Sequence, residues 1–259
     1  MKIHFKNFRR IYYHFLIFVL ISASITLFIN SNIDSIGSIE VAGLILEKIN
    51  ISIIIVFSLM ITVAIFKLYN LKRTFTVKLN TYGEYPMFIW RVIRYVFWYK
   101  KISIKHLPIY LQLSLINEGF FDIEEHYDSV EEDDAIKVDV KEIGDYSTDT
   151  VVFLIEDSYK INFDELPENS LKHTMVCFDR KGKEKNRRLY TKQMIIKVDK
   201  IINTLPKNIN IVDLFMNTNP LTTLKLAKNC FFTGGRKRLR FRVYQYNIGV
   251  NWDGPVAEF

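Results

Sequence analysis

The sequence predicts an N-terminal α-helical transmembrane hairpin followed by a cytosolic α/β domain of Rossmann-like type. The first observation behind this prediction is a pair of uncharged, strongly apolar runs, Ile11 to Ile29 and Ile49 to Phe66. The second is an alternation of buried-strand and amphipathic-helix patterns between Val151 and Tyr246, which is typical of a parallel sheet with crossover helices. In chain order we expect a cytoplasmic basic N-terminus (1–10), transmembrane helix 1 (11–29), a short external loop (30–48), transmembrane helix 2 (49–66), a basic aromatic juxtamembrane segment (67–105) and the cytosolic α/β domain (106–259).

Each apolar run is long enough to cross a bilayer, because about 18 residues of helix extend roughly 28 Å and the hydrocarbon core is ~30 Å thick. Neither run contains Asp, Glu, Lys or Arg, which argues against a solute pathway within one chain. Both runs carry hydroxyl residues at four-residue spacing, a pattern suited to close helix packing. It fits two helices that pack on each other, and it also fits self-association into an oligomer. The residues are Ser22, Thr26, Ser58 and Thr62.

Charges beside the runs predict the orientation. Basic residues without acids precede the first run and follow the second, whereas acids outnumber bases in the loop between them. By the positive-inside rule, both termini then lie in the cytoplasm. The basic residues are Lys2, Lys6, Arg9 and Arg10 before the first run and Lys67, Lys72, Arg73 and Lys78 after the second.

The segment 67–105 mixes basic and aromatic side chains, for example Arg91 and Arg94 among Phe88, Trp90 and Tyr95. This mixture is typical of a juxtamembrane helix that lies against anionic headgroups. It is equally typical of an ordinary amphipathic helix packed on the domain.

The chain offers little for catalysis or metal binding. Its two cysteines, Cys177 and Cys230, have no metal-ligand spacing, and its five histidines are scattered. It has no Gly-rich phosphate loop and no HExxH pattern. We therefore expect no enzyme activity, no catalytic residue, no metal and no cofactor.

The second half of the chain has the clearest pattern of elements. Continuous apolar runs predict buried strands, helical spacing of apolar residues that ends before Pro206 predicts a long helix, and strict alternation predicts the last strand. The expected strands are Val151–Ile155, Thr174–Phe178, Ile209–Met216 and Leu239–Tyr246, and the expected helices are about 187–205 and 220–232.

In such a sheet, ligands bind beyond the carboxyl ends of the strands. Asn219 is placed to cap the helix that follows the third strand, and Pro220 to occupy its first turn, which leaves free backbone N–H groups for an anion such as phosphate. Neighbouring hydrogen-bonding groups suit a base or ribose, and Lys225, Arg236 to Arg240 and Arg242 can supply charge. Asn-x-Asn-Pro is also a common helix start, and a basic strand also fits a solvated face. The neighbouring residues are Asn217, Thr218, Thr222 and Thr223.

The stretch from Ile209 to Lys228, with the strand Phe241–Tyr246, resembles the closing part of SAVED domains. Those domains have an apolar strand ending in Leu-Phe, a small loop, a Pro that opens a helix, and a final strand with a Tyr-x-Tyr-like end. The strand from Val151 to Asp157, with its polar exit, also fits that pattern. The resemblance therefore adds residues at this exit to the expected ligand site, which are Asp157, Ser158 and Tyr159.

SAVED domains are similar to the CARF ligand-sensing domains of CRISPR signalling, and the family recognises cyclic oligonucleotides made by a neighbouring nucleotidyltransferase in bacterial (CBASS) antiphage defence. Members fused to two transmembrane helices are thought to damage the inner membrane. The resemblance thus implies a two-span effector in the bacterial inner membrane that binds a cyclic oligonucleotide, forms a homo-oligomer and disrupts the lipid bilayer, with no DNA partner. Two alternatives are a membrane-anchored interaction module, or a two-span effector of another defence system, such as a retron-linked one, gated by a protein partner. An anchored enzyme acting on nucleotides is a third.

Overall fold

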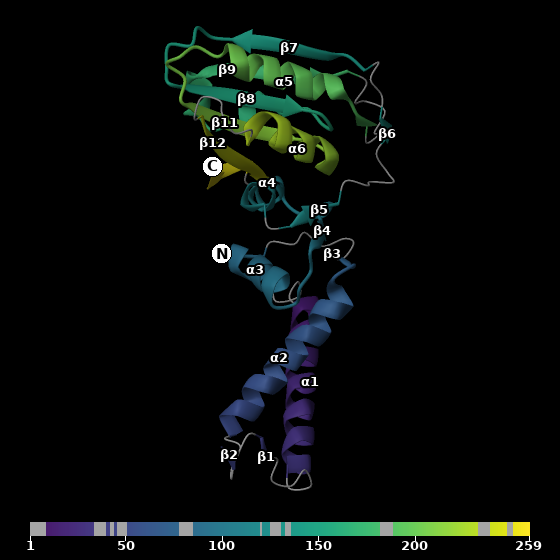
Figure 1. Cartoon of the computed structure of the whole chain (residues 1–259). Helices are drawn as coiled ribbons and strands as arrows, with labels where there is room; N and C mark the ends of the chain where they lie inside the picture. Colours follow the sequence, from purple (N-terminus) through teal and green to yellow (C-terminus); the bar gives the residue numbers. More distant parts are fainter. Residues whose placement is uncertain are drawn as a thin grey trace. The chain divides into compact units, whose positions relative to one another are not determined.

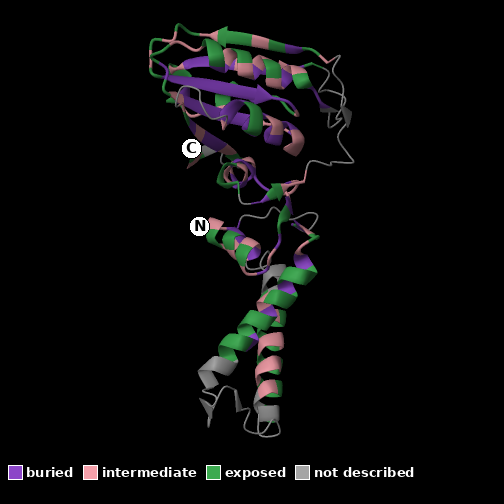
Figure 2. Ribbon diagram, viewed as in Figure 1, coloured by how far each residue is buried: buried purple, intermediate pink, exposed green. Residues whose placement is uncertain are grey.

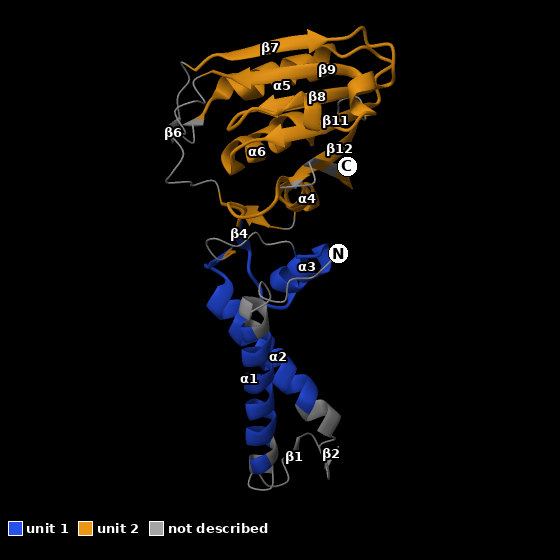
Figure 3. Cartoon of the chain, turned by 180° about the vertical axis from the view of Figure 1, so that it is seen from behind, with its two compact units in different colours: residues 1–75, 85–102 blue, residues 76–84, 103–259 orange. Residues whose placement is uncertain are grey.

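The structure is a computed structural model of the chain. It describes residues 9–33, 40–41, 44–45, 51–77, 85–119, 121–124, 131–132, 136–181, 189–232, 239–247 and 251–259. The chain divides into two compact units, which are coloured in Figure 3: unit 1 comprises residues 1–75 and 85–102, and unit 2 comprises residues 76–84 and 103–259. Element labels follow Figure 1.

Unit 1 is built on two helices, α1 (Arg9–Ile33) and α2 (Ile51–Asn70), which contact each other where they cross (Figure 1). The helical state of both apolar runs is thereby confirmed. Within the described residues, no helix combines the length and the apolarity of a membrane span. The short strands β1 (Glu40–Val41) and β2 (Leu44–Ile45) pair antiparallel between the helices in sequence.

The buried face of α2 follows a four-residue spacing. Ser58, Thr62 and Asn70 are wholly buried and Phe66 is nearly so, whereas most other described residues from Ile55 to Tyr69 are exposed (Figure 2). The Thr62 hydroxyl donates to the Ser58 carbonyl at 2.7 Å, so its polar group is satisfied inside the helix. The predicted hydroxyl face of α2 is thus used within the chain itself.

The rest of unit 1 is an aromatic cluster around α3 (Met87–Tyr95). Trp90 and Ile93 are fully buried, and the Trp90 indole N–H donates to the Tyr85 carbonyl at 3.0 Å. The Asn70 side chain donates to the Phe97 carbonyl at 2.7 Å, which ties the end of α2 to the turn after α3. The amphipathic helix expected in the basic aromatic segment is therefore present, with its apolar face packed within unit 1.

Unit 2 contains a six-stranded mixed sheet in the order β13-β12-β11-β8-β9-β7. The four strands β12, β11, β8 and β9 run parallel, and the edge strands β13 and β7 run antiparallel to their neighbours. The strands are β7 (Val138–Ile143), β8 (Thr150–Glu156), β9 (Thr174–Arg180), β11 (Ile211–Asn217), β12 (Arg240–Asn247) and β13 (Asn251–Glu258).

The sheet has apolar layers on both faces, which explains why β8 is buried along its whole length (Figure 2). Phe153 faces the layer formed by α4 (Ile109–Glu118), α5 (Lys192–Thr204) and α6 (Pro220–Leu226). Leu154 faces the other layer, where Ile161 and Leu166 cover the sheet and pack in one cluster with Trp252 of β13. That second layer has two short 3₁₀ turns, Phe163–Glu165 and Ser170–Lys172, between β8 and β9 in sequence.

The structure confirms the four predicted strands and corrects two helix boundaries. The long helix begins at Lys192, because Thr191 caps it by accepting from the Gln193 amide at 3.3 Å. The last helix is shorter than expected, since α6 passes into a π-helical segment, Ala227–Phe231. The remaining short strands are β3 (Thr74–Thr76), β4 (Lys101–Ser103), β5 (Asp122–Ile123), β6 (Glu131–Glu132) and β10 (Leu189–Tyr190), of which β6 and β10 pair in parallel.

Candidate functional site

The predicted site residues gather where β8 and β11 end side by side. In the sheet, β8 lies between β9 and β11. The chain goes from β8 to β9 on one side of β8 and then crosses to β11 on the other side of β8, so the strand order reverses between β8 and β11. Such a reversal is where ligands bind in open α/β sheets. The amides of Asp157 and Ser158 both donate to the Asn217 carbonyl, at 3.1 and 2.8 Å, which joins the exits of the two strands.

The Asp157 carboxylate links this junction to the start of α6. Its Oδ2 accepts from the backbone and side-chain amides of Asn219, at 3.2 and 2.7 Å. Asp157 is fully buried, and burial is the largest influence on its carboxyl group, raising its pKa, while Arg180 and the hydrogen bonds oppose that shift. A carboxylate in this position fixes the loop between β11 and α6 rather than facing solvent.

Arg180 completes the cluster from the end of β9, and the sequence analysis did not identify it. Its Nε lies 2.9 Å from Asp157 Oδ1 and also donates to the Asp157 carbonyl, and both side chains are only 1% exposed. Three parallel strands therefore contribute to one buried polar cluster. The signal available in the sequence was the charged pair Asp179-Arg180 directly after an apolar run, in the same position as Glu156-Asp157.

The predicted cap is confirmed, but two of the backbone N–H groups expected to be free for an anion are in use. Asn219 Oδ1 accepts from the Thr222 amide at 2.9 Å, and the Asn219 carbonyl accepts from the Thr223 amide at 2.9 Å. Thr222 and Thr223 are wholly buried, and Thr223 shares a 2.7 Å hydrogen bond with Thr218. The correction has a simple cause: the helix has only seven α-helical residues, and its cap satisfies the first donors locally.

The nine predicted residues thus fall into two groups. Four are buried and bonded into the junction, namely Asp157, Asn219, Thr222 and Thr223. The other five are less buried, with Tyr159 63% exposed and the rest half-buried, and Lys225 lies in the last turn of α6 rather than at the helix start that Asn219 caps. These five are Ser158, Tyr159, Asn217, Thr218 and Lys225.

Of the basic residues expected to supply charge, 236–238 lie outside the described residues, and the two arginines on β12 are paired with carboxylates. Arg242 forms a bidentate pair with the buried Asp213, through Nε to Oδ1 at 2.6 Å and Nη2 to Oδ2 at 2.9 Å. Arg240 is exposed and pairs with Glu258 at 3.4 Å. Both guanidinium groups therefore have carboxylate partners within the sheet.

Cys177 lies on β9 near the site, and its environment predicts low reactivity. Burial raises the pKa of its thiol to about 11, with Glu156 adding to the shift. At pH 8 we expect its alkylation by iodoacetamide to be roughly a hundredfold slower than in the urea-unfolded chain, because the thiolate is the nucleophile. Peptide mass spectrometry would measure this rate, and equal rates in folded and unfolded protein would contradict the expectation.

The described part of the chain contains no cluster of three His, Cys, Asp or Glu residues that suits a metal ion. The site is a cluster of hydrogen-bonding groups around one buried ion pair. Such groups can bind and orient a polar ligand.

Comparisons with known proteins extend this picture. The sequence model of one protein family, the SMODS- and Ubiquitin system-associated 2TM effector domain, matches residues 8–251 of this chain. Among solved structures, the Acinetobacter baumannii Cap4 SAVED/CARF-domain containing receptor with 3'3'3'-cAAA has a TM-score of 0.43 and 11% identity, over 66% of this chain and 41% of that chain. The same receptor with 2'3'3'-cAAA has a TM-score of 0.42 and 12% identity, over 61% and 38%. This chain thus covers about two fifths of that receptor, and the comparison with curated proteins gave no match.

The family match extends from the start of α1 into β13 and includes the helical hairpin, the aromatic cluster and the site at the ends of β8, β9 and β11. The chain belongs to the family of SMODS- and Ubiquitin system-associated 2TM effector domains.

Proposed function

We propose that this protein is a membrane-bound antiphage effector whose α/β unit binds a cyclic oligonucleotide, and that binding drives self-association and disruption of the inner membrane. The observation that carries the proposal is the family match, because one effector family includes both the hairpin and the α/β unit. The resemblance of the strand ends to SAVED domains supports the choice of ligand. A nucleotidyltransferase encoded beside the gene would be the source of that ligand.

The less buried residues of the site support nucleotide binding. Tyr159 offers an exposed ring on which a base can stack. Ser158, Asn217 and Thr218 provide neutral hydrogen-bonding groups beside it, and Lys225 provides a charge. The buried junction behind them holds these groups in place, since its side chains are bonded to one another rather than to solvent.

Unit 1 supports the membrane role through its charge. Residues 51–75 and 85–102 contain basic residues and no acid, and cations of these segments lie over aromatic rings. Arg73 lies over the Tyr69 ring at 3.8 Å and Lys67 over the Trp98 ring at 4.9 Å. Cations beside interfacial aromatic rings favour anionic headgroups.

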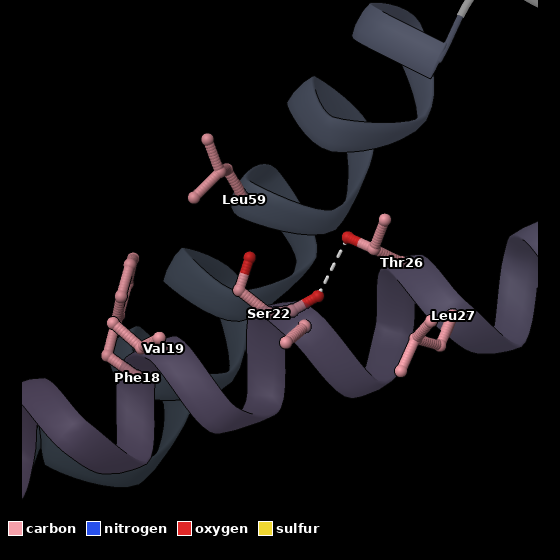
Figure 4. Close-up of a pocket in the computed structure, with 7 residues that line it drawn as sticks. Phe18, Val19, Ser22, Thr26, Leu27 and Leu59 are labelled. Atoms are coloured by element: carbon pink, nitrogen blue, oxygen red, sulfur yellow. Dashed lines mark hydrogen bonds between the residues drawn. The ribbon is translucent and has the colours of Figure 1, made fainter.

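A groove between α1 and α2 supports self-association. It has a volume of about 490 Å³ and an almost wholly apolar lining (Figure 4). Ser22 and Thr26 lie on it with their hydroxyl hydrogen bond satisfied inside α1, at 2.9 Å from Thr26 Oγ1 to the Ser22 carbonyl. The equivalent residues of α2 are buried in the hairpin, so we assign the α1 groove to a helix of a second copy. Its lining is Phe18, Val19, Ser22, Ala23, Thr26, Leu27 and Leu59.

A thermal-shift screen of the full chain in detergent tests ligand binding. The panel should contain cyclic di-, tri- and tetranucleotides, including 3'3'3'-cAAA, with the matching linear oligonucleotides as controls. A specific ligand at a hundredfold excess over its dissociation constant should stabilise the protein by about 2.7 kcal/mol. Tyr159→Ala should weaken this stabilisation without lowering the unliganded midpoint, because the ring is exposed.

Stabilisation by no cyclic nucleotide would refute the proposed ligand and favour gating by a protein partner. Consumption of a nucleotide during the assay would instead indicate an anchored enzyme.

A further inference from the structure

Arg180 is a buried cation that the fold satisfies only in part. Its side chain is 1% exposed. Both of its contacts with Asp157, to the carboxylate and to the backbone carbonyl, are made by Nε. Among the described residues, Arg180 Nη1 is buried without a hydrogen-bond partner. A guanidinium carries five N–H donors and no acceptor, so an open donor here costs free energy unless an acceptor arrives.

The other arginine pair of the same sheet shows the contrast. Arg242 uses Nε and Nη2 on the two oxygens of Asp213, which is the usual fork geometry. Arg180 instead meets Asp157 through Nε, which lies close to Oδ1 and donates to the carbonyl, while Oδ2 accepts from Asn219. The pair therefore leaves Arg180 Nη1 and Asp157 Oδ1 without a hydrogen bond, although Oδ1 lies 2.9 Å from Arg180 Nε.

The position of Arg180 places this open donor near the candidate ligand site. It ends β9, beside the exit of β8 and next to the strand-order reversal where the site lies. We propose that Arg180 is the anion-recognising residue of the site and that its Nη1 receives a phosphodiester oxygen of the ligand. This inference rests on the proposed function, since it names the residue that reads the ligand's charge.

The two members of the pair should then have opposite effects on anion binding. Asp157 neutralises Arg180 and repels an anion, whereas Arg180 attracts one. A pair with only a structural role would lower stability when either member is replaced and would leave anion binding unchanged. If replacement of Asp157 strengthens anion binding and replacement of Arg180 weakens it, the pair recognises the anion and does not serve stability alone.

The test uses the full chain in detergent and inorganic phosphate as a probe without a base, with chloride at equal ionic strength as reference. Phosphate should raise the thermal midpoint of the wild type. Asp157→Asn should show the same rise in thermal midpoint at a roughly tenfold lower phosphate concentration, and Arg180→Gln should show no rise with phosphate. Arg180→Lys should keep a weaker response, and Asp157→Asn/Arg180→Gln, which removes both buried charges, should be folded and unresponsive. Arg242→Gln is the matched control and should respond as the wild type does.

Each outcome decides the inference. It is overturned if phosphate does not protect the wild type, or protects Arg180→Gln equally. A cyclic nucleotide that protects the wild type and Arg180→Gln alike would also overturn it, while leaving the proposed function intact. Phosphate protection that depends on Arg180, without protection by any cyclic nucleotide, would uphold the inference and refute the proposed function.

Discussion

Arg180→Met is expected to lower the free energy of unfolding of the α/β unit by about 3–5 kcal/mol, because it leaves the buried Asp157 carboxylate without its counter-charge. Asp157→Asn should have a cost of similar size, since it leaves the guanidinium alone. The double variant Asp157→Asn/Arg180→Met should recover much of the loss, as exchange of a whole buried ion pair for neutral groups is often close to neutral. We expect a coupling free energy of about 2 kcal/mol or more.

Urea unfolding of the full chain in detergent, followed by circular dichroism, would measure this cycle, with equal m-values as the check that the same surface unfolds. The exposed pair of Lys181 and Asp139, joined at 2.9 Å, is the matched control and should show no measurable coupling. Single costs that simply add would show that Asp157 and Arg180 act independently.

The parts of unit 2 that follow from local pattern could be predicted from the sequence. Val151 to Ile155 is apolar at every position because β8 is covered on both faces, and this predicts a central strand directly. The cap of α6 follows from the chemistry of two residues, Asn219 and Pro220. These features depend on residues that are adjacent in the sequence, so they can be predicted from one sequence.

The features that were missed depend on position in the sheet. β7 mixes apolar and charged residues because much of this edge strand is exposed, so it has no buried run to recognise. β13 contains Gly254 and Pro255, which usually interrupt strands and are tolerated at an edge. The role of Arg180 depends on β8 and β9 being adjacent, with Asp157 buried between Arg180 and Asn219. No local pattern indicates that adjacency.

Ala23→Leu is expected to reduce ligand-triggered membrane leakage roughly tenfold. Ala23 is an exposed, small residue on the groove between α1 and α2. A leucine there would occupy the space into which a second copy's helix must pack, and small residues at such contacts allow the close approach that stabilises helix pairs in lipid. The measurement is dye release from liposomes that contain the full chain, after addition of the nucleotide that stabilises it best.

The variant must remain folded and able to bind, so its thermal shift with that nucleotide should match that of the wild type. Val56→Leu, at an exposed position of α2 outside the groove lining, is the matched control and should leak as the wild type does. Ser58→Leu differs from both, because Ser58 is wholly buried and a larger side chain there would separate the hairpin itself. Full leakage from Ala23→Leu would show that the groove is not the contact between copies. Loss of leakage with intact ligand binding would show that self-association follows ligand recognition and precedes membrane damage.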